Sequence, residues 1–268
     1  MQRAKASLNG IDIYYEIRGE GPPLLLISGL GLSSLVWQPV LQQFPTGFTV
    51  ITMDNRGTGR SDVPQGPYSI DDLADDTAAL LRHLDLGTVS VVGWSLGGSV
   101  LQSLLTRHGD LLERAVLLSA FPSYTPLQHA WLDAGLMVRR QGLDPLSITL
   151  SGMPWSFTAR LLSDHGKAVA RAQFAAQTPF PTSLKGFEAQ AAGLRAYDSR
   201  SELPKVATPV QVLVGAEDVL TPVSQSVEIA ELIPHARLKV LPRGGHAMVL
   251  EYPDETLDAI LGFLQKGS

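Results

Sequence analysis

The sequence of 268 residues has no cysteine, which excludes disulfides, thiolate metal sites and a cysteine nucleophile. Charge is also scarce: Asp, Glu, Lys and Arg make up 18% of the residues, and the net charge is −5. This balance provides no basic area for nucleic acid and no polybasic segment for a membrane surface. The apolar runs are too short to span a bilayer, and the first residues do not have the pattern of a secretory signal. We therefore expect a cytoplasmic, soluble protein with no nucleic-acid or membrane partner.

What the sequence does contain is 44% hydrophobic residues, in a chain long enough for one large domain with or without an insertion. Short apolar runs alternate with helix-length segments, and this alternation predicts a doubly wound α/β sheet with helices on both faces. The alternation of apolar and polar residues at 11–18 predicts a half-exposed antiparallel strand there. The expected buried parallel strands are 24–27, 49–53, 89–92, 115–118, 210–214 and 237–241. The expected helices are 35–43, 70–84, 96–107, 223–232 and 255–264.

The alternation is interrupted between residues 122 and 200, where helical segments occur without clear strands. Because strands resume at residue 210, this stretch is interpreted as a helical cap inserted into one core, which consists of residues 1–121 and 201–268. Its aromatic side chains Trp131, Trp155 and Phe157 are candidates for an apolar substrate pocket, although each could equally pack the inside of the cap. Trp94 is a further pocket candidate, with packing below the neighbouring serine as the alternative.

A serine flanked by glycines follows the strand expected at 89–92, in the sequence VVGWSLGGSV at 91–100. Strand, Gly-x-Ser-x-Gly and helix in this order are typical of a sharp turn that holds a nucleophilic serine. Side chains at Gly93 and Gly97 would collide with the neighbouring strand or helix. Ser95 is therefore the candidate nucleophile, at a helix N-terminus that favours developing negative charge.

A serine nucleophile needs a base, and the base needs an acid to orient it. His246 is the best candidate base, because it follows the last expected strand on a glycine-bearing loop at the sheet edge from which Ser95 also emerges. The acid is expected after the strand at 210–214, where Asp218 is the first choice and Glu217 the alternative. The other histidines are interpreted as surface or core residues: His83, His108, His129, His165 and His235.

Acyl transfer also needs N–H donors for the oxyanion. One would be the backbone N–H of Leu96, which follows the nucleophile. The other would be that of Leu30, in the loop that begins Ser28-Gly29 after the strand at 24–27.

Five motifs together resemble the α/β-hydrolase superfamily across nearly the whole chain: SGLG at 28–31, MDNRGTGRSD at 53–62, GWSLGG at 93–98, GAED at 215–218 and GGH at 244–246. The resemblance implies an α/β-hydrolase fold with a mostly parallel sheet of eight strands, a helical cap, and a triad of Ser95, Asp218 and His246. It implies no cofactor and no metal, and a scaffold role for Arg56 and Asp62.

Within the superfamily the chain is most similar to the group of 3-oxoadipate enol-lactonases and aminoacrylate hydrolases. Ser28 departs from the histidine that many members have there. The leading hypothesis is a serine hydrolase whose small-molecule substrate is a carboxylic ester or lactone. The alternatives are a cofactor-free perhydrolase or carbon–carbon hydrolase with the same triad, and a ligand receptor on a hydrolase scaffold. The physiological substrate and the oligomeric state stay open.

Overall fold

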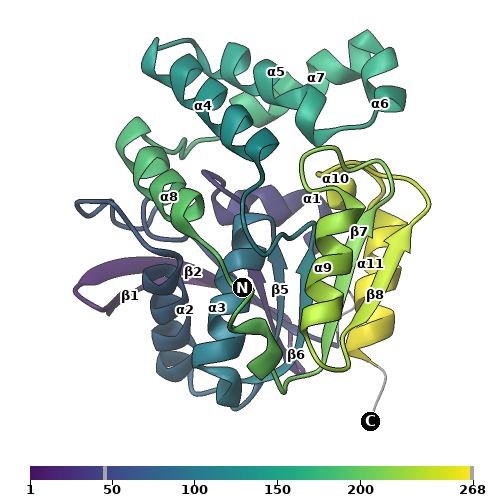
Figure 1. Ribbon diagram of the computed structural model, residues 1–268. Helices are drawn as coiled ribbons and strands as arrows, with labels where there is room; N and C mark the ends of the chain where they lie inside the picture. The colour runs from purple at the N-terminus through teal and green to yellow at the C-terminus, as the bar shows by residue number, and fades with distance from the viewer. Residues whose placement is uncertain (45–46, 266–268) are drawn as a thin grey trace.

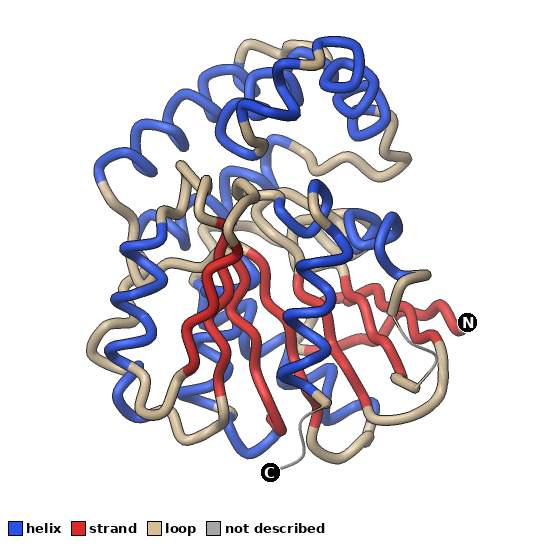
Figure 2. Tube along the Cα trace, turned by 90° about the vertical axis from the view of Figure 1, so that its right-hand side faces the viewer, coloured by secondary structure: helices blue, strands red, loops and turns tan. Residues whose placement is uncertain are grey.

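The computed structural model describes residues 1–44 and 47–265. Its centre is one sheet of eight strands in the order β1-β2-β4-β3-β5-β6-β7-β8, which Figure 2 shows in red. The antiparallel strand β2 pairs with β1 and β4, and the neighbours from β4 to β8 are all parallel. The expected fold class is thereby confirmed. The strands are β1 (Gln2–Leu8), β2 (Ile11–Arg18), β3 (Pro23–Ile27), β4 (Thr49–Met53), β5 (Val89–Trp94), β6 (Leu112–Leu118), β7 (Val210–Gly215) and β8 (Arg237–Leu241).

Helices cover both faces of the sheet (Figure 1). On one face lie α2 (Ile70–Leu84), α3 (Leu96–Arg107) and α9 (Val223–Leu232), and on the other lie α1 (Gln38–Leu41), α10 (Met248–Glu251) and α11 (Pro253–Leu264). Successive residues of a strand point to opposite faces, so Leu25 and Ile27 enter the first core whereas Leu24 and Leu26 enter the second. This two-sided burial explains why the central strands are continuous apolar runs.

Three elements differ from the sequence expectation. Strand β8, which was expected to be buried, lies at the edge of the sheet, and its residues 237–240 are exposed. Strand β1 was not predicted from its own residues, because Ala6 is the one fully buried side chain in it and the strand therefore lacks an apolar period. The helix expected at 35–43 is a turn of 3-10 helix (Ser34–Trp37) followed by the short α1. Pro39 explains the break, because it has no N–H for the carbonyl of Leu35 and its ring would clash with that carbonyl in a continuous α-helix.

Five further helices lie between β6 and β7 in the chain: α4 (Pro126–Arg140), α5 (Pro145–Ser156), α6 (Ala159–Ser163), α7 (His165–Ala176) and α8 (Leu184–Ala196). Figure 1 shows α4–α7 as a layer above the sheet, with α8 lower and to one side. The two ends of this helical segment meet, because Ser123 and Asp198 form an isolated β-bridge and the N–H of Ser199 donates to the carbonyl of Pro122 at 3.0 Å. The segment thus leaves and rejoins the rest of the molecule at one place.

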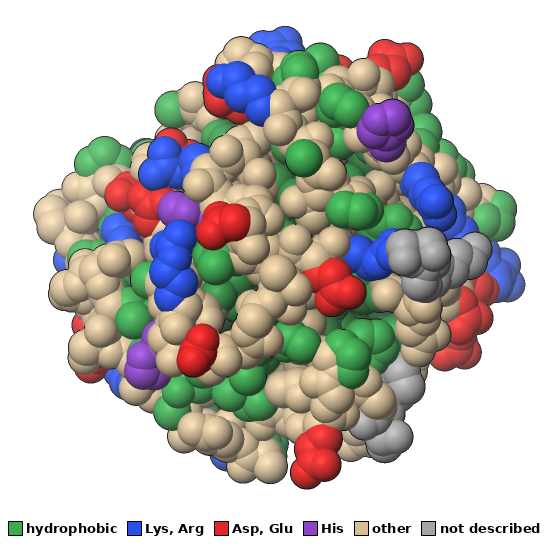
Figure 3. Space-filling view, turned by 90° about the horizontal axis from the view of Figure 1, so that it is seen from below, with side chains coloured by type: hydrophobic (Ala, Val, Ile, Leu, Met, Phe, Trp, Pro, Cys, Tyr) green, Lys and Arg blue, Asp and Glu red, His purple; other side chains and the backbone are tan. Residues whose placement is uncertain are grey.

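The helices of residues 1–44 and 47–265 include none that is long and apolar enough to cross a membrane. The face away from α4–α7 carries acidic and basic side chains interspersed with apolar and neutral ones (Figure 3). Among the described residues drawn there, no extended area carries charge of one sign.

Candidate active site

Ser95 occupies the turn between β5 and α3, with φ 57° and ψ −116°. A positive φ is uncommon for a residue with a β-carbon and is held only where the surroundings determine it. The N–H of Ser95 donates to the carbonyl of Leu118 on β6 at 3.0 Å, and its carbonyl accepts the N–H groups of Gly98 and Ser99 in the first turn of α3. The side chain is partly exposed, in contrast to its buried neighbours Trp94 and Leu96. The turn therefore presents the hydroxyl to the space outside the core.

The glycines on either side of Ser95 are required by close backbone contacts, as the sequence predicted. A β-carbon at Gly93 would lie 2.2 Å from the carbonyl oxygen of Gly97. A β-carbon at Gly97 would lie 2.3 Å from the carbonyl oxygen of Ile27, at the end of β3. Because both obstacles are backbone atoms, neither can move aside as a side chain would.

His246 lies on the loop after β8 and contacts Asp218 on the loop after β7. Its Nδ1 is 3.1 Å from Oδ2 of Asp218, and both side chains are buried. Thr221 supports the pair, since its hydroxyl lies 2.7 Å from the same carboxylate oxygen and 3.0 Å from Nδ1. The other carboxylate oxygen accepts the N–H groups of Leu220 and Thr221 at 3.0 and 2.8 Å. These contacts hold the ring with Nε2 directed away from Asp218.

The environment keeps the Asp218 carboxylate ionised. Burial by itself would raise its pKa, but the nearby His246 and the hydrogen bonds from His246 and Thr221 outweigh that effect and leave the pKa below its usual value. A carboxylate held in this way favours a proton on Nδ1 of the ring and stabilises an imidazolium when one forms.

The alternative acid Glu217 and a second histidine, His108, have partners other than Asp218 and His246. Glu217 is exposed, and its carboxylate accepts the N–H of Gly244 at 3.3 Å. A second His–Asp pair, His108 with Asp75 at 2.7 Å, lies at the C-terminal end of α3. Ser95 is at the other end of that 12-residue helix, about 18 Å away at 1.5 Å per residue.

The turn of Ser95 and the loop of His246 are joined directly. The indole Nε1–H of Trp94 donates to the carbonyl oxygen of His246 at 2.9 Å, and the two rings have centroids 6.2 Å apart. Among the described residues, the side chains of Ser95 and His246 share no hydrogen bond.

The loop from Ser28 to Ser34 passes beside Ser95. A β-carbon at Gly29 would lie 3.5 Å from the β-carbon of Ser95. Within the described part of the chain, the N–H groups of Leu30 and Leu96 have no hydrogen-bond acceptor. Both candidate oxyanion donors are thus available, and they belong to segments that contact each other through the turn.

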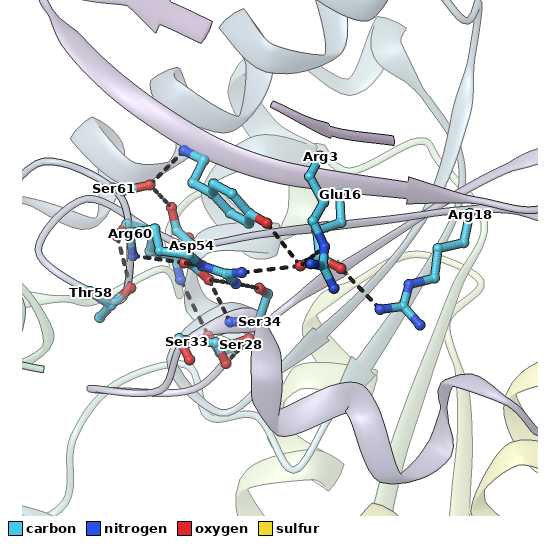
Figure 4. A network of polar contacts seen from close by, with 12 residues as sticks. Arg3, Glu16, Arg18, Ser28, Ser33, Ser34, Asp54, Thr58, Arg60 and Ser61 are labelled. Carbon is cyan, nitrogen blue, oxygen red and sulfur yellow. Dashed lines mark hydrogen bonds and ion pairs between the residues drawn. The ribbon is translucent and has the colours of Figure 1, made fainter. Parts of the chain in front are cut away.

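A buried polar network holds this loop from behind (Figure 4). The N–H of Ser34 donates to Oδ1 of Asp54 at 2.7 Å, and Arg60 donates to the hydroxyl of Ser34 at 2.9 Å. Arg60 also pairs with Asp54 at 2.9 Å and with the buried Glu16 at 3.0 Å. Burial would lower the pKa of Arg60, but these acidic partners raise it, so the guanidinium remains charged.

The two residues expected to be scaffold have structural contacts. Arg56 makes a two-point contact with Asp76 on α2, at 2.6 and 2.7 Å. Asp62 accepts the N–H of Asp12 on β2 at 2.9 Å. Both residues therefore connect the segment after β4 to neighbouring elements.

The candidate pocket residues have different environments. Trp94 is 4% exposed and packs in the core, below the turn of Ser95. Trp131 is half-buried and, with Leu30, borders an apolar cluster between α4 and α8. Phe157 is half-buried against the His246 loop, since a β-carbon at Gly245 would lie 3.2 Å from its carbonyl carbon. Trp155 is half-buried on α5.

Some features of the site were not predicted from the sequence. Thr221 and the Asp54–Arg60 network are hidden among ordinary polar residues, and their roles depend on contacts between distant segments.

Two grooves of about 560 and 580 Å³ border α8, but neither is lined by Ser95, Asp218 or His246. Among the described residues, no group of three or more His, Asp or Glu side chains is arranged to hold a metal ion.

Comparison with known proteins agrees with this fold. A family model described as the alpha/beta hydrolase fold matches residues 22–253. The chain therefore belongs to the α/β-hydrolase family, and its relatives support hydrolase activity.

Two curated relatives and one solved structure illustrate the similarity. A protein named "Putative carbamate hydrolase RutD" from Agrobacterium fabrum is 30% identical over 94% of this chain and 98% of its own length. The 3-oxoadipate enol-lactonase 2 of Acinetobacter baylyi is 29% identical over 93% of this chain and 91% of its own. The crystal structure of the enol-lactonase from Burkholderia xenovorans LB400 superposes with a TM-score of 0.87 at 27% identity, covering 98% of this chain and 100% of that one.

The contact between the start of α3 and the end of β3 can be tested with Gly97→Ala. The added β-carbon meets the carbonyl of Ile27, so we expect the free energy of unfolding to fall by about 2 kcal/mol or more in urea denaturation. Gly262→Ala is the matched control, because Gly262 lies on the exposed side of α11 with nothing within 4 Å, and alanine there should stabilise by up to about 1 kcal/mol. Equal stabilities of the two variants would contradict the contact.

The Asp218 environment predicts a pH-dependent contribution to stability. The folded pKa is below the unfolded value of 3.8, so the carboxylate stabilises the fold above that value and loses its contribution as the pH falls through the folded pKa. In urea denaturation from about pH 7 to about pH 3, the deficit of Asp218→Asn relative to the unsubstituted protein should therefore shrink below about pH 4. A deficit that stays constant or grows toward acid pH would refute this assignment.

Proposed function

We propose that the protein is a serine hydrolase that cleaves a carboxylic ester or lactone through an acyl-enzyme. Ser95 is the nucleophile, His246 the general base and acid, and Asp218 the group that orients His246. The N–H groups of Leu30 and Leu96 stabilise the oxyanion. Residues 122–200 form the cap over this site, and residues 1–121 and 201–268 form the core, of which 45–46 and 266–268 lie outside the described residues.

The observation that carries the proposal is that the His246 loop contacts both Asp218 and Trp94, the residue before Ser95. His246 contacts Asp218 at 3.1 Å through Nδ1, and its Nε2 has no hydrogen-bond partner among the described residues. The same loop accepts a hydrogen bond from Trp94, the residue directly before Ser95. A partly exposed hydroxyl on a strained turn, whose neighbour Trp94 is bonded to the loop of a buried and oriented imidazole, supports nucleophilic catalysis.

The first half of the reaction forms the acyl-enzyme. Oγ of Ser95 attacks the carbonyl carbon of the substrate while Nε2 of His246 takes the hydroxyl proton. The carbonyl oxygen becomes an oxyanion, which accepts the two free N–H groups beside the turn. The tetrahedral intermediate then collapses, and the imidazolium gives its proton to the leaving alkoxide.

The second half repeats this chemistry with water. His246 takes a proton from the water, whose oxygen attacks the acyl carbon bound to Oγ of Ser95. A second oxyanion forms at the same donors, and its collapse returns the proton to Ser95 and releases the acid. Asp218 stays ionised throughout and compensates the imidazolium charge in both halves.

The substrate class follows from the relatives and the surroundings. Because the relatives include enol-lactonases, a lactone or ester is the substrate class that we propose for this chain. Trp131 and Phe157, which lie near the Leu30 and His246 segments respectively, would supply apolar walls for a small or medium acyl group. A panel of short-chain nitrophenyl esters, lactones, enol-lactones and carbamates would identify the preferred bond.

Substitution of the three proposed catalytic residues tests the assignment. Ser95→Ala and His246→Ala should each lower kcat on the best ester by about a thousandfold or more, because each removes a group that bonds or transfers a proton. Asp218→Asn should lose less than either, though still substantially. Steady-state kinetics measures all three.

Glu217→Gln is the matched control for the acid, one residue away on the same loop. Its carboxylate contacts Gly244 and not His246, so kcat should stay within about twofold of the unsubstituted enzyme. Normal activity in Asp218→Asn together with a large loss in Glu217→Gln would reverse the choice of acid.

A further inference from the structure

Two buried tryptophans lie edge to face beneath the proposed catalytic centre. The ring centroids of Trp37 and Trp94 are 6.0 Å apart with planes at 68°. Trp37 is 0% exposed and Trp94 is 4% exposed. Both belong to the core on the α1 and α11 side of the sheet. Each indole has one polar hydrogen, and in a buried position it needs an acceptor.

Trp37 gives its N–H to the loop that carries Leu30. Its Nε1 donates to the hydroxyl oxygen of Ser28 at 3.1 Å, and that hydroxyl donates in turn to the carbonyl of Ser33 at 3.4 Å. Ser28 and Ser33 are the two ends of the turn that contains Gly29 and Leu30. The indole therefore fixes the loop that would direct the Leu30 N–H toward the oxyanion.

Trp94 gives its N–H to the loop that carries His246. The acceptor is the backbone carbonyl of His246 itself, at 2.9 Å. Since Trp94 is the last residue of β5 and Ser95 follows it, this bond ties the base to the backbone of the nucleophile. The two indoles thus connect the three segments that the proposed chemistry needs in register.

We propose that Trp37 and Trp94 act together as positioning residues, which hold the oxyanion loop and the His246 loop relative to Ser95. This inference rests on the proposed serine hydrolase function. The one polar hydrogen of each indole is bonded to a loop and so is not available to the substrate. Each indole acts through a loop. Because the two rings are in edge-to-face contact, a shift of one ring also shifts the other.

The positioning role predicts a loss in kcat and not in substrate binding. A misplacement of about 1 Å can cost about a hundredfold in rate, so Trp37→Phe and Trp94→Phe should each lower kcat by about ten- to a hundredfold. Phenylalanine keeps most of the ring packing and removes the N–H. KM for the best ester should remain within about threefold, because ground-state contacts are unchanged.

Two further measurements separate positioning from packing. Phenylboronic acid, which adds to a serine hydroxyl as a tetrahedral adduct, should bind Trp37→Phe more weakly by the factor lost in kcat/KM. The double variant Trp37→Phe/Trp94→Phe should lose less than the product of the single losses, because the two rings act as one unit.

Leu81→Ala is the control for a loss of stability alone. Leu81 is buried on α2, away from the three loops, so this variant should have a lower melting temperature and an unchanged kcat below it. If Trp37→Phe does not fold, Ser28→Ala removes the acceptor instead and should give the same kcat loss. If Trp94→Phe does not fold, replacement of the tryptophans by benzothienylalanine, an isostere without the N–H, should lower kcat similarly.

The outcomes distinguish this inference from the proposed function. If Ser95→Ala keeps the kcat of the unsubstituted protein, the proposed function fails and this inference fails with it. If Ser95→Ala is inactive but the tryptophan variants keep full kcat, the inference alone is overturned. A fall in kcat accompanied by an equally large rise in KM would overturn it as well. Strictly multiplicative losses in the double variant would also overturn the coupled role of the two rings.

Discussion

The structure depends on the close approach of α3 to the end of β3. The carbonyl oxygen of Ile27 lies 2.3 Å from the place a β-carbon of residue 97 would take, and the carbonyl oxygen of Gly97 lies 2.2 Å from that of residue 93. Only glycine at both positions allows the chain to leave β5 and begin α3 within one residue. That residue is Ser95, which is held at a positive φ with its side chain outside the core.

The remaining parts of the candidate site are arranged around this turn by neighbouring loops. Parallel strands bring their carboxyl ends to one edge of the sheet, so the loops after β3, β7 and β8 meet there although they are far apart in sequence. Buried side chains then fix each loop: Asp54 and Trp37 hold the first, and Thr221 and Trp94 hold the pair of Asp218 and His246. The relative positions of these loops are thus determined by the buried side chains that hold them.

The sequence predicted most of the fold and indicated candidate residues for the site, because both leave local signals. Apolar runs predicted the central strands, and the glycines around Ser95 marked the turn. It did not predict β1, whose side chains are mostly exposed, or the break at Pro39. The indole contacts of Trp37 and Trp94 were also missed, since they join segments that only the folded chain brings together.

The central claim is that the Ser95 hydroxyl is the group that forms the covalent intermediate. Its most direct test is reaction with a fluorophosphonate, followed by digestion and mass spectrometry of the peptides. The account predicts one adduct per chain, on Ser95, formed much more slowly in His246→Ala and absent from Ser95→Ala. Hydrolysis of esters by a protein that never acquires the adduct, or an adduct on another residue that abolishes activity, would contradict it.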